Sequence, residues 1–194
     1  MRTGSGGWPA TLQDVGAGID YLRKLAETYP LDVKRVAAVG HSAGGHLVLW
    51  AAARRHLPKN SPLYVADPLP LRGAVSLGGV PDLASFVQYS KSGCGERLVR
   101  LMGGQPEDVK DRYRQGSPSE LLPIGAPQWL IWGALDKTAP HDIFLGYEAA
   151  AKKSGGAVRV IVLENSAHFE MLSPETEAWP TVERAILDAL APDH

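Results

Sequence analysis

The sequence predicts a three-layer α/β fold in which a mostly parallel sheet lies between layers of helices. Short, mostly apolar segments alternate along the chain with longer segments whose apolar residues recur at helical spacing. The apolar segments lack a polar face, as strands do when helices cover both sides of a parallel sheet. The length of 194 residues suits a single domain.

Four strands and four helices are expected. The strands are predicted at residues 35–40, 71–77, 128–132 and 158–163. The helices are predicted at residues 9–29, 42–55, 141–153 and 178–190. Residues 81–123 mix glycine, proline and charge, which predicts loops and short helices, including one near residues 96–102. We expect this segment to act as a cap or lid inserted in the domain.

Composition excludes several classes of partner. The net charge of −1 provides no electrostatic attraction to nucleic acid or to an anionic membrane. No apolar run is long enough to span a bilayer, and the N-terminal residues lack the apolar core of a signal peptide. The single cysteine, Cys94, excludes an internal disulfide and is interpreted as an incidental loop thiol. We therefore expect neither a nucleic-acid nor a membrane partner, and a cytoplasmic location.

A candidate nucleophile follows the first strand. Gly40-His41-Ser42-Ala43-Gly44 matches the pattern G-x-S-x-G, in which a serine sits on a tight turn between a strand and a helix. Small flanking residues let this turn close, and the serine hydroxyl then projects from the sheet edge. The N–H of Ala43 lies at the helix N-terminus, where it can stabilise an oxyanion. The alternative is that Ser42 only caps the helix.

A serine hydroxyl needs a base, and His168 is the strongest candidate among six histidines. It follows the fourth predicted strand, and loops after parallel strands gather at the edge where Ser42 lies. Asp136 follows the third strand and is the candidate that orients the imidazole, with Asp142 as runner-up. The alternatives are a solvated loop histidine and an aspartate that serves a turn or a helix cap.

These residues resemble those of the α/β-hydrolase superfamily, in particular its esterase, kynurenine-formamidase-like and prolyl-oligopeptidase-like branches. The resemblance covers nearly the whole chain and is carried by residues 7–15, residues 40–46, the Asp136 loop and residues 167–169. It implies a Ser42–His168–Asp136 triad that needs neither a metal nor an organic cofactor. The chain order Ser, Asp, His is the order of this superfamily.

The resemblance also has a gap. Members of the superfamily have further strands before the helix that leads to the nucleophile strand. They also have a His-Gly-Gly loop that supplies part of the oxyanion hole. Neither feature occurs here before residue 35. We therefore expect the chain to be the C-terminal portion of a longer α/β-hydrolase. Residues 36–39 are apolar and carry no edge protection, so this strand is expected to be exposed and able to pair chains into a homo-oligomer.

Three side chains are candidate substrate contacts: His41, Asp82 and Phe86. Asp82 has helix capping as its alternative, and Phe86 has packing of the cap onto the body. The function predicted from these features is hydrolysis of a small carboxylic ester or amide through an acyl-enzyme. An aryl-formamide, a short peptide or acyl transfer fits the same triad. The competing hypothesis is a catalytically impaired fragment that acts as a binding or assembly module.

Overall fold

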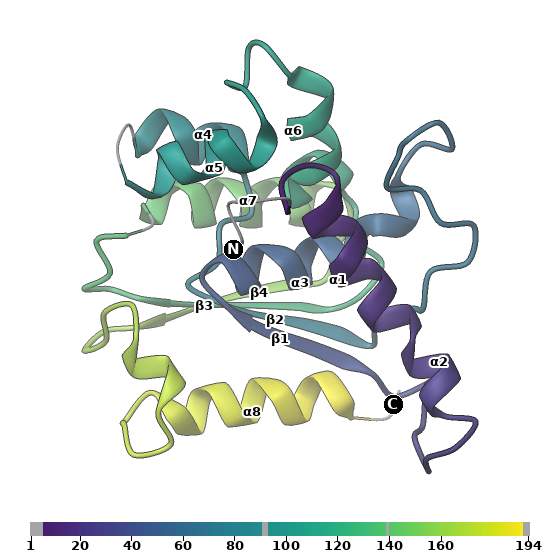
Figure 1. The fold of residues 1–194 in the computed structure, drawn as a ribbon. Helices are drawn as coiled ribbons and strands as arrows, with labels where there is room; N and C mark the ends of the chain where they lie inside the picture. The colour runs from purple at the N-terminus through teal and green to yellow at the C-terminus, as the bar shows by residue number, and fades with distance from the viewer. Residues whose placement is uncertain (1–5, 91–92, 139, 192–194) are drawn as a thin grey trace.

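The computed structural model describes residues 6–90, 93–138 and 140–191. Its centre is a parallel sheet with the strand order β1 (Ala37–His41), β2 (Gly73–Leu77), β3 (Gln128–Gly133) and β4 (Val158–Leu163). Helices cover both faces of this sheet (Figure 1). The predicted α/β fold class is therefore confirmed, together with the expectation of about four strands.

The helices agree closely with the sequence pattern. They are α1 (Ala10–Asp20), α2 (Leu22–Leu25), α3 (Ala43–Ala53), α4 (Leu83–Tyr89), α5 (Cys94–Met102), α6 (Lys110–Gly116), α7 (His141–Lys153) and α8 (Trp179–Leu190). Three 3-10 turns span Arg54–His56, Pro118–Leu121 and Glu170–Leu172. The single helix predicted over residues 9–29 is divided at Tyr21, and its last residues form turns rather than a helix.

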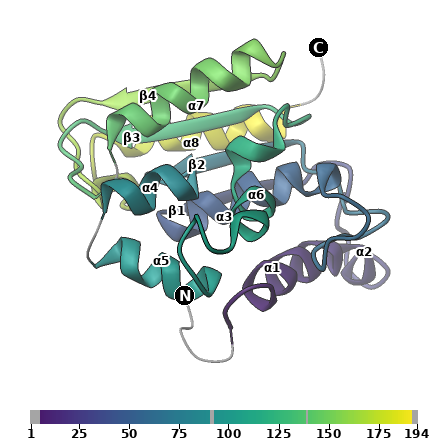
Figure 2. The same ribbon diagram turned by 90° about the horizontal axis from the view of Figure 1, so that it is seen from above.

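The strand order determines which face each helix covers. The strands follow one another across the sheet in one direction, and right-handed crossovers then place every connection on the same side. Helices α3 and α7 and the segment from α4 to α6 accordingly lie on one face, together with α1 (Figures 1 and 2). Helix α8 follows the last strand and covers the opposite face.

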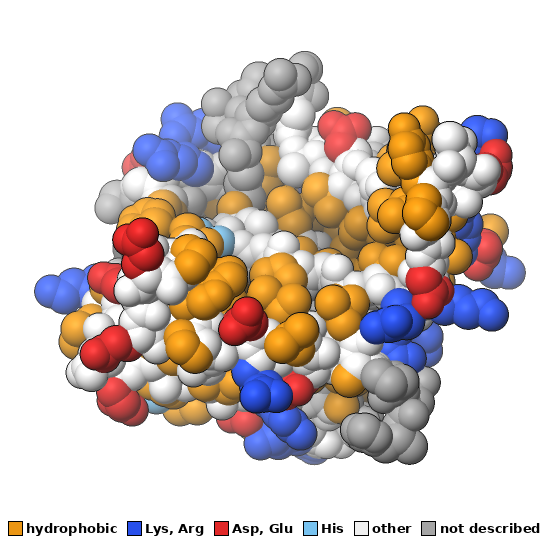
Figure 3. Space-filling model, turned by 90° about the horizontal axis from the view of Figure 1, so that it is seen from below, with side chains coloured by type: hydrophobic (Ala, Val, Ile, Leu, Met, Phe, Trp, Pro, Cys, Tyr) orange, Lys and Arg blue, Asp and Glu red, His pale blue; other side chains and the backbone are white. Residues whose placement is uncertain are grey.

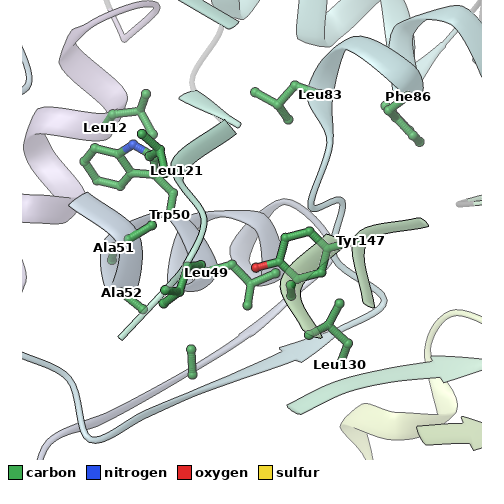
Figure 4. Close-up of a cluster of buried hydrophobic side chains, with 14 of the residues drawn as sticks. Leu12, Leu49, Trp50, Ala51, Ala52, Leu83, Phe86, Leu121, Leu130 and Tyr147 are labelled. Atoms are coloured by element: carbon green, nitrogen blue, oxygen red, sulfur yellow. The ribbon is translucent and has the colours of Figure 1, made fainter. Parts of the chain in front are cut away.

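Alternating residues of the central strands build two hydrophobic cores. Val75 and Ile131 point toward α8, where they pack with Val182. Ala74 and Leu130 belong to the larger core on the other face. Figure 4 shows part of that core, including Leu49 and Trp50 of α3, Leu12 of α1 and Tyr147 of α7. The two central strands, β2 and β3, are buried along their whole length, which accounts for their largely apolar sequences.

Strand β1 lies at an edge of the described sheet. Within residues 6–90, 93–138 and 140–191 it pairs only with β2, and its Val39 is 41% exposed. Figure 3 views the molecule from the α8 side, where hydrophobic side chains reach the surface between charged ones. In the described part of the chain, no helix combines the length and apolar character needed to cross a membrane.

A buried ion pair attaches the N-terminal helix to the body. Arg54 follows α3, is 3% exposed, and forms a two-pronged contact with the Asp20 carboxylate at the end of α1. Its Nη1 also donates to the carbonyl of Gly16 at 2.9 Å. The Asp20 carboxylate has a further partner, because its Oδ1 accepts the backbone N–H of Leu69 at 2.7 Å. Arg54 thus connects the end of α3 to α1, and Asp20 connects this pair to the loop before β2.

We expect Arg54→Ala to lower the free energy of unfolding by about 2–4 kcal/mol, because it leaves the partly buried Asp20 with only the more distant cation of Arg23, 3.8 Å away. Urea unfolding followed by tryptophan fluorescence measures this change. Lys24→Ala is the matched control, since it removes an exposed ion pair with Glu27 in the same region and is expected to cost less than about 1 kcal/mol. Equal losses in the two variants would contradict the anchoring role of Arg54.

Candidate active site

Ser42 occupies a strained turn between β1 and α3. Its φ of 54° and ψ of −118° make it the sole residue other than glycine with a positive φ in the described part of the chain. A conformation of this kind costs on the order of 1–3 kcal/mol, so the surroundings must impose it. The N–H of Ser42 donates to the carbonyl of Leu77 at 2.8 Å, and its own carbonyl accepts from the N–H of His46.

The flanking glycine makes this turn possible. A Cβ on Gly40 would lie 2.3 Å from the carbonyl oxygen of Gly44, a distance that no side chain tolerates. The turn directs the chain straight into α3, whose first residue is Ala43. The N–H of Ala43 therefore lies in the first helical turn, where N–H groups have no acceptor within the helix. This is the position that the sequence assigns to an oxyanion donor.

His168 and Asp136 form a buried pair. His168 Nδ1 and Asp136 Oδ2 are 2.7 Å apart, and the two residues are 8% and 7% exposed. The second carboxylate oxygen of Asp136 accepts the N–H of Thr138, also at 2.7 Å. With Nδ1–H donated to the carboxylate, the Nε2 lone pair of His168 is the one left to accept a proton.

The loop that carries His168 is held on both sides. His41 Nε2 donates to the carbonyl of His168 at 2.7 Å, and the two imidazole rings are 4.5 Å apart. The carboxylate of Glu170 accepts the N–H groups of Ala167 and Phe169, at 3.0 and 3.2 Å. Burial lowers the pKa of His41, which favours the neutral form of the ring. His41 and Glu170 thus fix the backbone around the candidate base.

The loops of Asp136 and His168 also meet directly. The N–H of Leu135 donates to the carbonyl of Ser166 at 2.9 Å. A Cβ on Gly133 would lie 2.3 Å from the carbonyl oxygens of both Ser166 and Ala167, so only glycine lets the two loops approach this closely. This approach sets the distance over which the imidazole and the carboxylate meet.

A pocket of about 430 Å³ opens beside Ser42. Ser42, Ala43 and Gly78 form one end of its lining. Its walls come from α4, α5 and the loop before them, with Val80, Leu83, Phe86, Leu98 and Leu101. The helices that belong to the predicted cap therefore border the candidate nucleophile, near the carboxyl ends of the strands (Figure 2). Whether they open and close as a lid remains a prediction.

One of the three predicted substrate contacts lines the pocket and the other two do not. Phe86 lines the pocket, whereas His41 and Asp82 lie outside its lining. The His41 ring instead holds the His168 loop, and Asp82 caps α4 by accepting the N–H of Ser85 at 2.9 Å. Both side chains therefore have local partners, and their assignment to substrate stays a prediction.

Gly78 lies between the pocket and the His168–Asp136 pair. A Cβ there would be 3.2 Å from His168 Nδ1 and 3.5 Å from Asp136 Oδ2. The same residue lines the pocket together with Ser42. The three predicted triad residues thus gather at one sheet edge, although no hydrogen bond joins Ser42 to His168 among the residues described. Such contacts commonly tighten only when substrate binds.

His46 is a site residue whose role the sequence did not indicate. It lies one turn after Ser42, lines the pocket, and its Nε2 donates to the carbonyl of Gly116 at 2.7 Å. Its Nδ1 is buried and has no partner in the described structure. Burial lowers the pKa of His46 to about 4, so the ring is neutral at pH 7. This hydrogen bond attaches the end of α6 to α3.

No group of three or more histidine, cysteine, aspartate or glutamate side chains in the described ranges is arranged to hold a metal ion. The chemistry available at this edge is that of a hydroxyl, an imidazole and a carboxylate. These groups suit nucleophilic attack on a carbonyl carbon with proton transfer through the imidazole.

Comparisons with known proteins agree with this arrangement. The BD-FAE family model matches residues 2–143. Esterase LipQ of Mycobacterium tuberculosis is 25% identical over 163 residues, which cover 83% of this chain and 39% of LipQ. The chain spans between 21% and 39% of the length of the curated relatives that it matches.

Two solved structures show the same fold. A truncated form of a carbohydrate esterase from gut microbiota superposes with a TM-score of 0.80 and 20% identity, covering 96% of this chain and 70% of that one. An esterase of the Planctomycetes species Thermogutta terrifontis gives a TM-score of 0.68 and 21% identity, covering 94% and 67%. Together with the family-model match and the esterase relatives, these structures confirm the predicted resemblance to the α/β-hydrolase superfamily.

We expect the stability of the protein to fall between about pH 6.5 and pH 4 because of His46. The folded pKa of about 4 lies below the ordinary value of 6.5, so the unfolded chain binds more protons in this interval. This contribution to stability is fully present above pH 6.5 and is lost as the pH falls through 4, by at most roughly 3 kcal/mol.

Urea unfolding of the wild type and of His46→Gln at several pH values measures this effect. Glutamine retains an N–H donor for Gly116 but does not titrate, so the wild type is expected to lose more stability than the variant on acidification. Parallel pH profiles for the two proteins would show that the buried imidazole contributes nothing.

Proposed function

The chain belongs to the BD-FAE family within the α/β-hydrolase superfamily, and from this we propose that it is a serine hydrolase of the esterase type. The observation that carries the proposal is the buried His168–Asp136 pair at the sheet edge where the strained Ser42 turn lies. Matched relatives that are named esterases support the same reaction class.

In this proposal, Ser42 Oγ attacks the carbonyl carbon of the substrate while His168 Nε2 accepts the hydroxyl proton. The Asp136 carboxylate holds the Nδ1–H and stabilises the imidazolium that forms. The N–H of Ala43 donates to the oxyanion of the tetrahedral intermediate. Collapse of this intermediate breaks the bond to the alcohol, which leaves with the proton from His168.

The second half of the reaction uses the same groups. Water attacks the acyl-enzyme, His168 takes its proton, and the imidazolium returns that proton to Ser42 as the carboxylic acid departs. No atom other than those of the ester and one water is consumed. Neither a metal nor an organic cofactor is required by this chemistry.

The pocket supports a small substrate. A volume of about 430 Å³ with an apolar wall accommodates a short acyl chain. We therefore propose carboxylic esters with short acyl groups as substrates. An activated amide on the same triad is included in the test below.

A fluorophosphonate probe is expected to label Ser42, because only a serine activated by a base reacts readily. Intact-mass analysis and peptide mapping locate the label. Ser42→Ala is expected to abolish both the labelling and the hydrolysis of p-nitrophenyl acetate and p-nitroanilide analogues. Asp136→Asn is expected to reduce kcat for the ester by about 10²- to 10⁴-fold, because the imidazole loses its orienting acceptor.

Ser85→Ala is the matched control, since this serine is exposed on α4 and its hydroxyl has no assigned role. Labelling at a serine other than Ser42 would overturn the nucleophile assignment. A folded protein that is neither labelled nor active would favour the binding or assembly module over the enzyme.

A further inference from the structure

The pocket beside Ser42 has one charged side chain in its described lining, that of Arg97. Arg97 lies on α5, and Cys94, Leu98 and Leu101 of the same helix line the pocket with it. These spacings of three and four residues place the four side chains on one side of the helix. Arg97 is an exposed residue, and its position on α5 is on the side of the helix that borders the pocket.

Arg97 has no carboxylate partner in the part of the chain that the structure describes. The adjacent residues Glu96 and Arg100 line a separate depression on another side of α5. The buried His46 ring at the pocket is neutral near pH 7, because burial lowers its pKa to about 4. The pocket thus offers one permanent positive charge that nothing in the described structure neutralises.

The rest of the pocket lining indicates which kind of ligand would approach Arg97. Ser42 and Ala43 mark the end where the carbonyl would react, and the wall of α4 and α5 is formed by apolar residues, among them Leu83, Phe86 and Leu98. An apolar chain in contact with this wall loses water-exposed surface, which favours binding. Arg97 lines the same pocket and is the charged residue that the far end of such a chain would meet.

The position of His168 identifies which half of an ester lies in this pocket. The imidazole must protonate the departing alcohol, so the alcohol lies on the His168 side of Ser42. Neither His168 nor Asp136 belongs to the pocket lining, whereas the nucleophile and the candidate oxyanion donor do. The pocket therefore receives the acyl half.

We propose that this pocket selects esters whose acyl chain ends in a carboxylate, with Arg97 binding that carboxylate and the apolar wall contacting the methylene groups between. The substrates are half-esters of dicarboxylic acids, and Arg97 is a specificity-determining residue. This inference rests on the proposed esterase function of Ser42. It names the acyl class within that function.

The test compares mono-p-nitrophenyl adipate with its methyl-capped diester, methyl p-nitrophenyl adipate, after subtraction of uncatalysed hydrolysis. The two substrates share one acyl chain and one leaving group and differ in the terminal charge. We expect the wild type to show a kcat/KM about fivefold higher for the half-ester, the size of a partly exposed ion pair. The preference is expected to shrink in 0.5 M NaCl.

Variants of Arg97 isolate the charge. Arg97→Gln is expected to bring the ratio of the two kcat/KM values to about one, Arg97→Glu to invert it, and Arg97→Lys to retain part of it. Arg100→Gln is the matched control, because it removes a cation from the same helix outside this pocket and is expected to leave the ratio unchanged. A wild-type ratio of one, or a ratio that Arg97→Gln does not alter, would overturn the inference while leaving the esterase function intact.

A binding measurement distinguishes failure of this inference from failure of the proposed esterase function. Calorimetry with the Ser42→Ala protein and the monoanilide of adipic acid measures the pocket without turnover, with the anilide of its methyl ester as the neutral comparison. Tighter binding of the acid that disappears in Ser42→Ala/Arg97→Gln supports the inference even in a protein that hydrolyses no ester. Equal binding of the two anilides contradicts it.

Discussion

The backbone of Ser42 is the constraint on which the site depends. Its positive φ carries a conformational cost, and several independent contacts maintain it. The hydrogen bond from Ser42 to Leu77 ties the turn to β2, and the missing side chain of Gly40 lets Gly44 pass. Helix α3 begins directly after the serine, so the N–H of its first residue, Ala43, lies next to Ser42. The candidate nucleophile, the candidate oxyanion donor and one end of the pocket are therefore positioned by one local geometry.

The candidate base is positioned by a second group of contacts, one of which comes from His41, the residue directly before Ser42. Asp136, His41 and Glu170 each restrain a different part of the His168 loop, namely its ring, its carbonyl and the flanking N–H groups. Gly133 allows the supporting loops to touch. The two groups meet at Gly78, so the distance between hydroxyl and imidazole depends on how β2 ends between β1 and β3.

Much of this arrangement could be predicted from the sequence, because it is encoded locally. The strand–turn–helix around Ser42 and the loops of Asp136 and His168 are set by apolar runs and by glycine. The partners of His41 and His46 could not be predicted in the same way. His41 and His46 bond to residues 127 and 70 positions away, and such pairings appear only when the sheet brings distant loops together. Asp82 caps its own helix, one of the two roles that the sequence allowed.

The edge position of β1 has a consequence for how activity and fold are lost. This strand ends one residue before Ser42 and is hydrogen-bonded on one side within the described sheet. Edge strands open locally at lower free energy than central strands, whose bonds break only in global unfolding. Trp129 and Trp132, by contrast, lie in the central strand β3. Fraying of β1 can therefore displace the candidate nucleophile while the buried indoles of β3 still report a native protein.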